Sequence, residues 1–142
     1  AGIGRHQLAK LDMFNLKREK FAKIYDESFK NHPGFKIPVI KEYSNSSRHL
    51  YPLLLNLEYF KIERDSFIDE LKENNIGTSV LFMPLHLHSY YKKSFGYSYG
   101  DFPISENIFD RIICLPISPK LSEDTINKVA ETILYISEKI KK

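Results

Sequence analysis

One stretch of the sequence decides the fold around it: Ile76-Gly77-Thr78-Ser79-Val80-Leu81-Phe82-Met83-Pro84-Leu85-His86-Leu87-His88-Ser89-Tyr90-Tyr91. β-Branched and apolar residues follow Gly77, and this pattern predicts a strand. Pro84 ends the strand because proline has no backbone N–H to donate to a neighbouring strand. Imidazole and phenol side chains follow the proline as far as Tyr91. A strand that ends in polar rings is typical of one wall of a binding pocket.

The two histidines of this stretch do not predict a metal site. His86 and His88 are two residues apart, so an extended chain places both on one face, as two metal ligands would lie. A structural zinc ion needs four ligands, and the only cysteine, Cys114, lies far along the chain. A surface loop with packed aromatic rings is the default interpretation of the segment taken alone.

Several short motifs follow one another along the chain. In order, they are Gly4-x-x-Gln7-Leu8-x-x-Leu11-Asp12, His49-Leu50-Tyr51-Pro52, Gly77-Thr78-Ser79-Val80-x-Phe82-x-Pro84-Leu85-His86-x-x-x-Tyr90-Tyr91, Gly100-Asp101-Phe102-Pro103, Leu115-Pro116 and Leu121-Ser122-Glu123-Asp124. This ordered set resembles the C-terminal region of the DegT/StrS aminotransferases. Members of that family are pyridoxal-phosphate enzymes that aminate keto sugars carried on nucleotides.

The resemblance implies that part of the stretch contacts the substrate. The residues expected to line the nucleotide-sugar site are Ser79, Val80, Leu81, Phe82, His86 and Tyr90. Phe82 would stack on a planar or sugar surface, while His86 and Tyr90 would bond hydroxyl or phosphate oxygens. Many family members carry histidine where this chain has Leu81, so no imidazole contact is expected there. The alternative is that Phe82 and Tyr90 belong to the core and His86 is a surface imidazole.

The resemblance also implies a larger enzyme. No lysine of the chain stands in the family's cofactor-lysine motif, so we assign no catalytic and no cofactor-binding residue. The full-length enzyme is expected to carry pyridoxal 5′-phosphate and to act as a homodimer in surface-polysaccharide or amino-sugar biosynthesis. Its substrates would be a nucleotide-linked keto sugar and an amino-acid donor, glutamate. The chain alone is expected neither to bind the cofactor nor to be active.

The composition excludes several function classes. The chain has 21 basic and 18 acidic side chains, and the resulting net charge of +3 is too small for a nucleic-acid surface when the charges are interspersed. No apolar run reaches the roughly 20 residues that span a bilayer. A single cysteine excludes an internal disulfide and fits a reducing compartment. We therefore expect a cytoplasmic protein that binds neither nucleic acid nor a membrane.

Two other functions remain open at this point. One is a stand-alone nucleotide- or sugar-binding module without catalysis. The other is a nucleic-acid module built on the aromatic residues between Tyr90 and Phe102, which alternate with Lys92 and Lys93. The near-neutral charge favours a role for these rings in anchoring a long loop.

Periodicity predicts a two-layer α/β domain, with a small, mainly antiparallel sheet and helices on one face, as in the small domain of fold-type I aminotransferases. The expected helices are 6–30, 65–74, 103–110 and 122–140, and the expected strands are 35–40, 49–57, 76–83 and 111–115. Residues 1–34 would form a long connecting helix, and residues 35–142 the compact domain.

Local signals refine this pattern. Pro52 indicates an edge strand or a bulge. Asp101 is the expected cap of the short helix and Ser122 that of the last helix, whose buried stripe would be Ile126, Val129, Ile133, Ile136 and Ile140. The first helix spans about 25 residues, or nearly 40 Å, which is more than one supporting helix needs, so its first turns should contact a larger domain.

Overall fold

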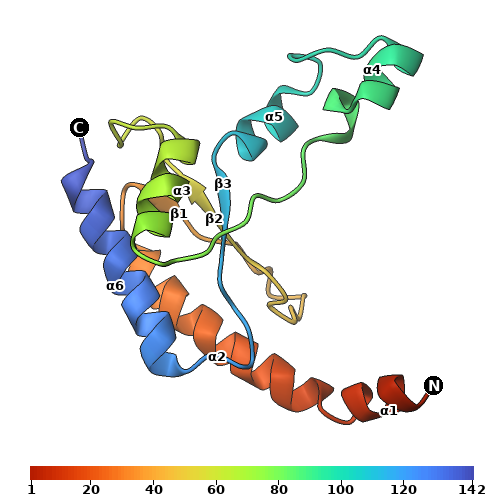
Figure 1. The fold of residues 1–142 in the computed structure, drawn as a ribbon, viewed down its shortest axis with the longest axis vertical. Helices are drawn as coiled ribbons and strands as arrows, with labels where there is room; N and C mark the ends of the chain where they lie inside the picture. The colour runs from red at the N-terminus through yellow and green to blue at the C-terminus, as the bar shows by residue number, and fades with distance from the viewer.

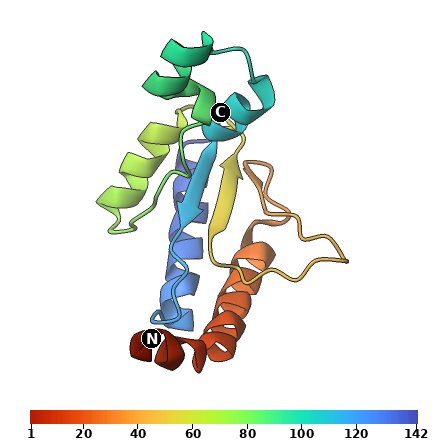
Figure 2. The ribbon, with the colours of Figure 1, turned by 90° about the vertical axis from the view of Figure 1, so that its right-hand side faces the viewer.

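The computed structural model describes residues 1–142 and contains a 3-stranded antiparallel sheet in the order β1-β2-β3. The two longest helices, α2 and α6, run side by side against one face of the sheet (Figures 1 and 2). The elements are α1 (Gly2–Leu8), α2 (Leu11–Phe29), β1 (Phe35–Lys36), β2 (Tyr51–Leu55), α3 (Arg64–Glu73), the short 3₁₀ helix η1 (Leu85–Leu87), α4 (Ser89–Phe95), α5 (Pro103–Phe109), β3 (Ile112–Leu115) and α6 (Glu123–Lys139).

The sheet has one face in the core and one face on the open side. Along β2, Tyr51, Leu53 and Leu55 are buried, whereas Pro52 and Leu54 are half-buried. Because successive side chains of a strand point to opposite faces, the first set packs against the helices and the second faces away from them. The predicted two-layer fold class is therefore confirmed.

The last helix forms as its sequence predicts. Ser122 Oγ accepts a hydrogen bond from the Thr125 N–H at 3.1 Å, which satisfies one free donor of the first turn. The residues predicted for its buried stripe all lie in the core: Ile126, Val129, Ile133, Ile136 and Ile140. Phe21, Ala22, Tyr25 and Phe29 of α2 belong to the same core, so the second half of that helix packs within the domain.

Pro52 lies in the central strand, not in an edge strand, and the hydrogen-bond pattern explains why it is tolerated. Cys114, the partner of Pro52 in the register, exchanges both of its backbone hydrogen bonds with Ser79, at 2.7 and 3.2 Å. The nitrogen of Pro52 therefore faces the β1 side. On that side β1 pairs only with Leu54 and Leu55. No strand residue lies opposite Pro52 there, so the missing N–H of the proline leaves no backbone carbonyl of the sheet without its donor.

The strand predicted for residues 76–83 is wrong. Ser79 makes a single bridge to Cys114, and no other residue between Gly77 and Pro84 pairs with the sheet. β3 has only four residues, so it offers this side few free groups, and the chain leaves the sheet after Ser79. Ribbon views show the segment running from the sheet towards α4 (Figure 1).

The predicted first helix is interrupted. It divides into α1 and α2 at Ala9 and Lys10, and α1 buries no residue. Short helices in water are marginal without tertiary packing, so nothing holds α1 in line with α2. The first buried residue of α2 is Phe21, and α1 lies at the far end from the sheet (Figure 1).

Residues 85–109, which we call the outer lobe, hold more helix than predicted. The segment expected to be a long aromatic loop contains η1 and α4, and α4 ends at Gly96, whose φ of 73° suits glycine. Asp101 does not cap α5; it accepts a hydrogen bond from the Ser98 N–H at 2.8 Å, and Phe102 occupies the cap position. The lobe projects beyond the sheet and the long helices (Figures 1 and 2).

His32 joins the end of α2 to α6. Its Nδ1 accepts a hydrogen bond from the Gly34 N–H at 3.1 Å, so Nε2 carries the proton and faces Ser137 Oγ at 3.1 Å. Burial lowers the pKa of His32; nearby Glu138 raises it by less, and Lys141 lowers it further. The folded chain therefore holds this imidazole neutral to lower pH than the unfolded chain does.

We expect stability to decline as the pH falls below about 6.5, because the unfolded chain binds a proton at His32 before the folded chain does. The stability supplied by neutral His32 is complete above that pH. In melting experiments between about pH 8 and pH 5.5, the advantage of the wild type over His32→Gln should shrink on acidification. A difference that stays constant with pH would contradict the assignment, and exposed His88→Gln is the control.

Candidate functional site

The structure separates the predicted site residues. Ser79, Phe82 and Tyr90 are exposed, Val80 and Leu81 are half-buried, and His86 is buried. Leu81 and Phe82 line one hollow together, Tyr90 lies on α4, and His86 lies inside the outer lobe. Neither Phe82, which is 91% exposed, nor Tyr90 belongs to the core. Substrate contact by these residues stays a prediction.

An apolar hollow of about 150 Å³ lies between this segment and α5. Its lining residues are Leu81, Phe82, Pro84, Ser105, Ile108, Phe109 and Ile112. Ile112 belongs to β3, so the hollow lies where the chain has left the sheet. Such a surface suits a methyl or acetyl group, or the face of a ring, with Ser105 as the hydroxyl partner.

A second hollow lies on the other side of Leu81. The loop before β2 contributes Ser46, Ser47, Arg48 and His49, and the remaining lining residues are Pro38, Ile40, Leu50, Pro52 and Leu81. Leu81 therefore lines both an apolar hollow and a hollow of mixed lining, in which hydroxyl, imidazole and guanidinium groups stand among apolar residues. Residues 79–82, together with these two hollows, form the candidate substrate wall.

Arg48 and Asp26 hold the loop before β2 against α2. Arg48 Nη2 donates to Asp26 Oδ2 at 2.9 Å, and the side chains are 14% and 21% exposed. Tyr51 Oη donates to Asp26 Oδ1 at 2.8 Å. Burial and the hydrogen bond to Asp26 raise the pKa of Tyr51, so the phenol stays protonated as a donor. Arg48 has a φ of 47°, a value that is uncommon for residues other than glycine. The contacts that hold the loop against α2 keep Arg48 in this conformation.

His86 and Glu106 form a buried pair in the outer lobe. They are 6% and 2% exposed, and His86 Nε2 lies 2.6 Å from Glu106 Oε1. The carboxylate also accepts the Gly100 N–H at 2.8 Å and the Phe102 N–H at 3.2 Å. Burial alone would raise the pKa of Glu106, but the hydrogen bonds from His86, Gly100 and Phe102 outweigh it and lower the pKa. Glu106 is therefore ionised at neutral pH.

Sequence reasoning missed Glu106. The available signal was weak: a single carboxylate on a short helix, with Gly100 and Phe102 just upstream. Glutamate is mostly exposed in proteins, so nothing in the local pattern predicts its burial. Its partner His86 was expected at the end of a strand, where its ring would have reached an open pocket.

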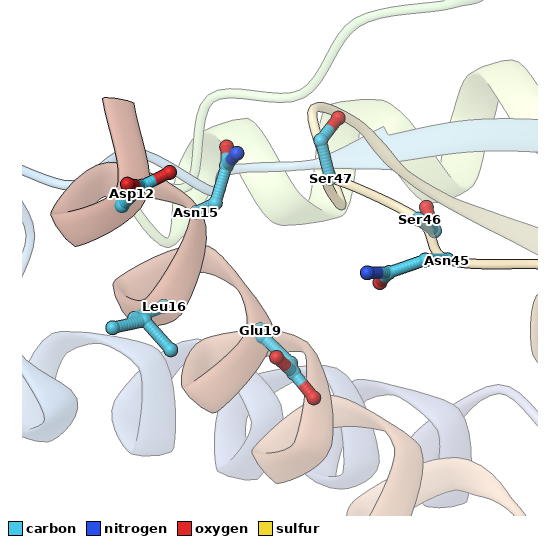
Figure 3. Close-up of a pocket in the computed structure, with 7 residues that line it drawn as sticks. All are labelled: Asp12, Asn15, Leu16, Glu19, Asn45, Ser46 and Ser47. Atoms are coloured by element: carbon cyan, nitrogen blue, oxygen red, sulfur yellow. The ribbon is translucent and has the colours of Figure 1, made fainter.

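A third hollow, of about 390 Å³, lies between α2 and the loop before β2 (Figure 3). Its lining is polar apart from one leucine: Asp12, Asn15, Leu16, Glu19, Asn45, Ser46 and Ser47. Arg18 fixes this geometry, since it donates to Ser47 O at 3.2 Å and to Asn15 Oδ1 at 2.6 Å. Its polar groups could bind hydroxyl or ammonium groups of a ligand. Its two carboxylates are exposed to solvent, however, so the hollow is open and not an enclosed site.

The chain offers no enclosed amine for cofactor chemistry. Every lysine is exposed, and none lines either hollow of the candidate substrate wall. No cluster of three or more metal-ligating side chains is present, and none of the helices is both long and apolar enough to cross a membrane. Ser137 is buried and donates to Leu134 O at 2.7 Å, so its contact with His32 does not make it a nucleophile.

Fold and site together define a small α/β domain whose open side carries aromatic, hydroxyl and arginine groups suited to binding. A comparison of the sequence with models of known protein families identifies the family. The chain belongs to the DegT/DnrJ/EryC1/StrS aminotransferase family, whose model matches residues 1–134. This finding confirms the resemblance inferred from the ordered motifs.

The relatives include proteins of known and unknown activity. An uncharacterised protein of Methanocaldococcus jannaschii is 50% identical over 96% of this chain and 35% of its own length. The UDP-4-amino-4,6-dideoxy-N-acetyl-beta-L-altrosamine transaminase of Campylobacter jejuni is 34% identical over 99% of this chain and 36% of its own.

Solved structures show the same fold. Helicobacter pylori PseC, described as an aminotransferase involved in the biosynthesis of pseudoaminic acid, matches with a TM-score of 0.87 and 27% identity, over 96% of this chain and 36% of that one. The chain thus spans about a third of the length of the relatives that it matches.

Proposed function

We propose that this chain is the part of a nucleotide-sugar aminotransferase that shapes the sugar side of the active site. The full-length enzyme would transfer an amino group from an amino acid, glutamate, to a nucleotide-linked keto sugar. The observation that carries the proposal is the position of residues 79–82, which leave the sheet between an apolar hollow and a second hollow whose lining mixes apolar residues with serine, arginine and histidine side chains. A nucleotide sugar has apolar ring faces and polar hydroxyl and phosphate groups, so it needs both kinds of surface.

Each site residue predicted from the sequence has a proposed role that fits its exposure. The rings of Phe82 and Tyr90 are free to stack on a ligand. Ser79 and Val80 lie at the edge of the sheet, where Ser79 is fixed by its bridge to Cys114. Leu81 gives the wall an apolar centre. His86 acts from inside the outer lobe, through its pair with Glu106.

The residues of this chain do not fit a resident pyridoxal phosphate. Forming the internal Schiff base needs a lysine held in a pocket, and every lysine here is exposed. The cofactor would therefore be held by the remainder of the full-length enzyme. Homodimer formation and a cytoplasmic location are part of the same proposal. The exposed apolar residues of α1 and the outer lobe support a further contact surface.

The test compares two equally exposed rings in the full-length protein. Phe82 is 91% exposed and Tyr43 is 89% exposed, but only Phe82 lines a hollow of the candidate substrate wall. Phe82→Ala should slow amino transfer to a nucleotide-linked keto sugar about tenfold and leave transfer from glutamate unchanged. Tyr43→Ala should change neither rate.

The measurement is the single-turnover rate of each half-reaction, amino transfer from glutamate and amino transfer to the keto sugar, for the wild type and both variants. Failure of the full-length protein to take an amino group from glutamate would instead favour a binding module without catalysis. Equal effects of the two substitutions would remove Phe82 from the site.

A further inference from the structure

A fourth hollow, of about 490 Å³, lies between α5 and the open face of the sheet, and we call it the basic hollow. Its charged residues are Lys36 of β1 and Arg111, which directly precedes β3, and no carboxylate lines it. Leu54 and four residues of α5 complete the lining, and of these only Asn107 is polar. Apolar walls around charges of one sign strengthen their attraction for an ion of the opposite sign. The lining therefore favours an anion.

The fold places both cations of the basic hollow and neutralises neither. Lys36 pairs with Leu54 in the register, so the two side chains share the open face of the sheet. Arg111 Nε donates to Asn107 O at 2.9 Å and Nη2 donates to Asn107 Oδ1, which holds the guanidinium against α5 and leaves Nη1 for a ligand. Neither cation belongs to an ion pair. An anchored guanidinium loses little further conformational freedom when it binds.

The neighbouring hollows suit an anion less well. In the hollow before β2, Arg48 is already paired with Asp26 at 2.9 Å. The hollow beside α2 carries the carboxylates of Asp12 and Glu19, which repel an anion. No charged residue lines the apolar hollow. An anionic group held near the apolar hollow therefore finds its unpaired cations in the basic hollow.

Ile108 joins the basic hollow to the candidate substrate wall, because it lines both the basic hollow and the apolar hollow beside Phe82. In a nucleotide sugar, the first phosphate is bonded directly to the anomeric carbon of the sugar. A sugar ring in the apolar hollow would therefore carry its diphosphate at the border that Ile108 forms. Two cations on different elements match the spread charge of a diphosphate better than the single charge of a carboxylate.

We propose that the basic hollow is a phosphate subsite, in which Lys36 Nζ and Arg111 Nη1 bind the diphosphate of a nucleotide sugar whose ring occupies the apolar hollow. The sugar part of this ligand rests on the proposed function; the affinity of the basic hollow for a diphosphate does not.

Lys36→Met is the informative substitution because it removes the charge and keeps an unbranched side chain at an exposed position of the short strand β1. Lys128→Met is the matched control, since Lys128 is also exposed but lies on α6, outside the basic hollow. Lys36→Arg keeps the positive charge and should retain binding if charge is what the ligand requires.

The experiment is isothermal titration of the full-length protein with inorganic pyrophosphate and with UDP-N-acetylglucosamine. Lys36→Met should weaken the binding of both about tenfold, as expected for one lost charge-assisted hydrogen bond. Lys128→Met and Lys36→Arg should stay within about twofold of the wild type. The effect of Lys36→Met should shrink when the salt concentration rises from about 0.05 M to about 0.5 M, because salt screens the attraction.

Hydrogen exchange on the wild type gives a second measurement that needs no variant. Pyrophosphate should slow exchange in α5, which forms one side of the basic hollow, and should leave α3 unchanged. Unchanged exchange in α5 would contradict the phosphate subsite, as would equal affinities of Lys36→Met and Lys128→Met for pyrophosphate.

The remaining outcomes separate this inference from the proposed function. If Lys36→Met weakens pyrophosphate but not UDP-N-acetylglucosamine, the assignment to a nucleotide sugar is wrong. If it weakens glutamate and neither phosphate compound, the basic hollow binds a carboxylate and the proposal is overturned. If the full-length protein transfers no amino group while Lys36→Met still weakens both phosphate compounds, the proposed reaction is refuted and the phosphate subsite stands.

Discussion

Asp26→Ala is expected to destabilise the chain by about 3 kcal/mol. Asp26 accepts hydrogen bonds from both Arg48 and Tyr51, and all three side chains are largely shielded from solvent. Removing the carboxylate leaves a guanidinium and a phenol without their acceptor. The guanidinium is the costlier of the two because Arg48 Nη1 is already sealed without a partner. Urea denaturation followed by circular dichroism measures the loss.

A matched control separates the buried network from an ordinary ion pair. Glu19 lies 3.1 Å from Lys23 Nζ, one turn further along α2, and both side chains are exposed. Glu19→Ala should therefore cost less than about 1 kcal/mol. Similar losses in the two variants would show that burial of Asp26 contributes nothing. Tyr51→Phe should fall between them, because it removes one donor and keeps the ion pair.

Amide hydrogen exchange should differ by at least about a thousandfold between the two ends of the N-terminal helical segment. Amides of α1 open locally at almost no free-energy cost, since no side chain of α1 is buried. Amides near Phe21 to Phe29 exchange only when the core opens, at several kcal/mol. Exchange measured by NMR or mass spectrometry on a monomeric sample tests this. Protection of Gly2–Leu8 equal to that of Phe21–Phe29 in a proven monomer would contradict it.

Sample concentration provides the control for that experiment. Ile3, Leu8, Leu11, Met13 and Leu16 expose apolar side chains along α1 and the first turns of α2. If the chain self-associates through them, protection of α1 should rise with concentration while protection near Phe21 to Phe29 stays constant. Sedimentation velocity on the same samples identifies the monomer range.

The sequence predicted best those elements that carry their own periodic signal. The stripe of α6 and its serine cap follow from spacing and local hydrogen bonding. β3 was predicted because its four residues are all apolar, as a buried strand requires. The features that define these elements, the apolar spacing and the cap, lie within a few residues of one another in the sequence.

Long-range pairing limited the rest. Residues 76–83 have the composition of a strand, but whether they pair depends on β3, and β3 offers them one bridge only. The helix α4 exposes every residue except half-buried Tyr91, so it has no apolar stripe to detect. Glu106 was missed because its burial depends on hydrogen bonds from the backbone N–H groups of Gly100 and Phe102, and the sequence does not show where those groups point. The candidate site was thus predicted as a segment, but its buried pair was not.

The separation between the outer lobe and the core has an evolutionary consequence. No residue between Leu85 and Phe109 belongs to the core cluster, which is assembled from both long helices, the sheet and α3. Substitutions on the exposed faces of α4 and α5 should therefore change the free energy of unfolding of the domain only slightly. As long as His86, Gly100 and Glu106 keep their contacts, the lobe can change its surface chemistry in small, individually tolerated steps. Under the proposed function, new substrate preferences would then arise on this scaffold without compensating changes in the core.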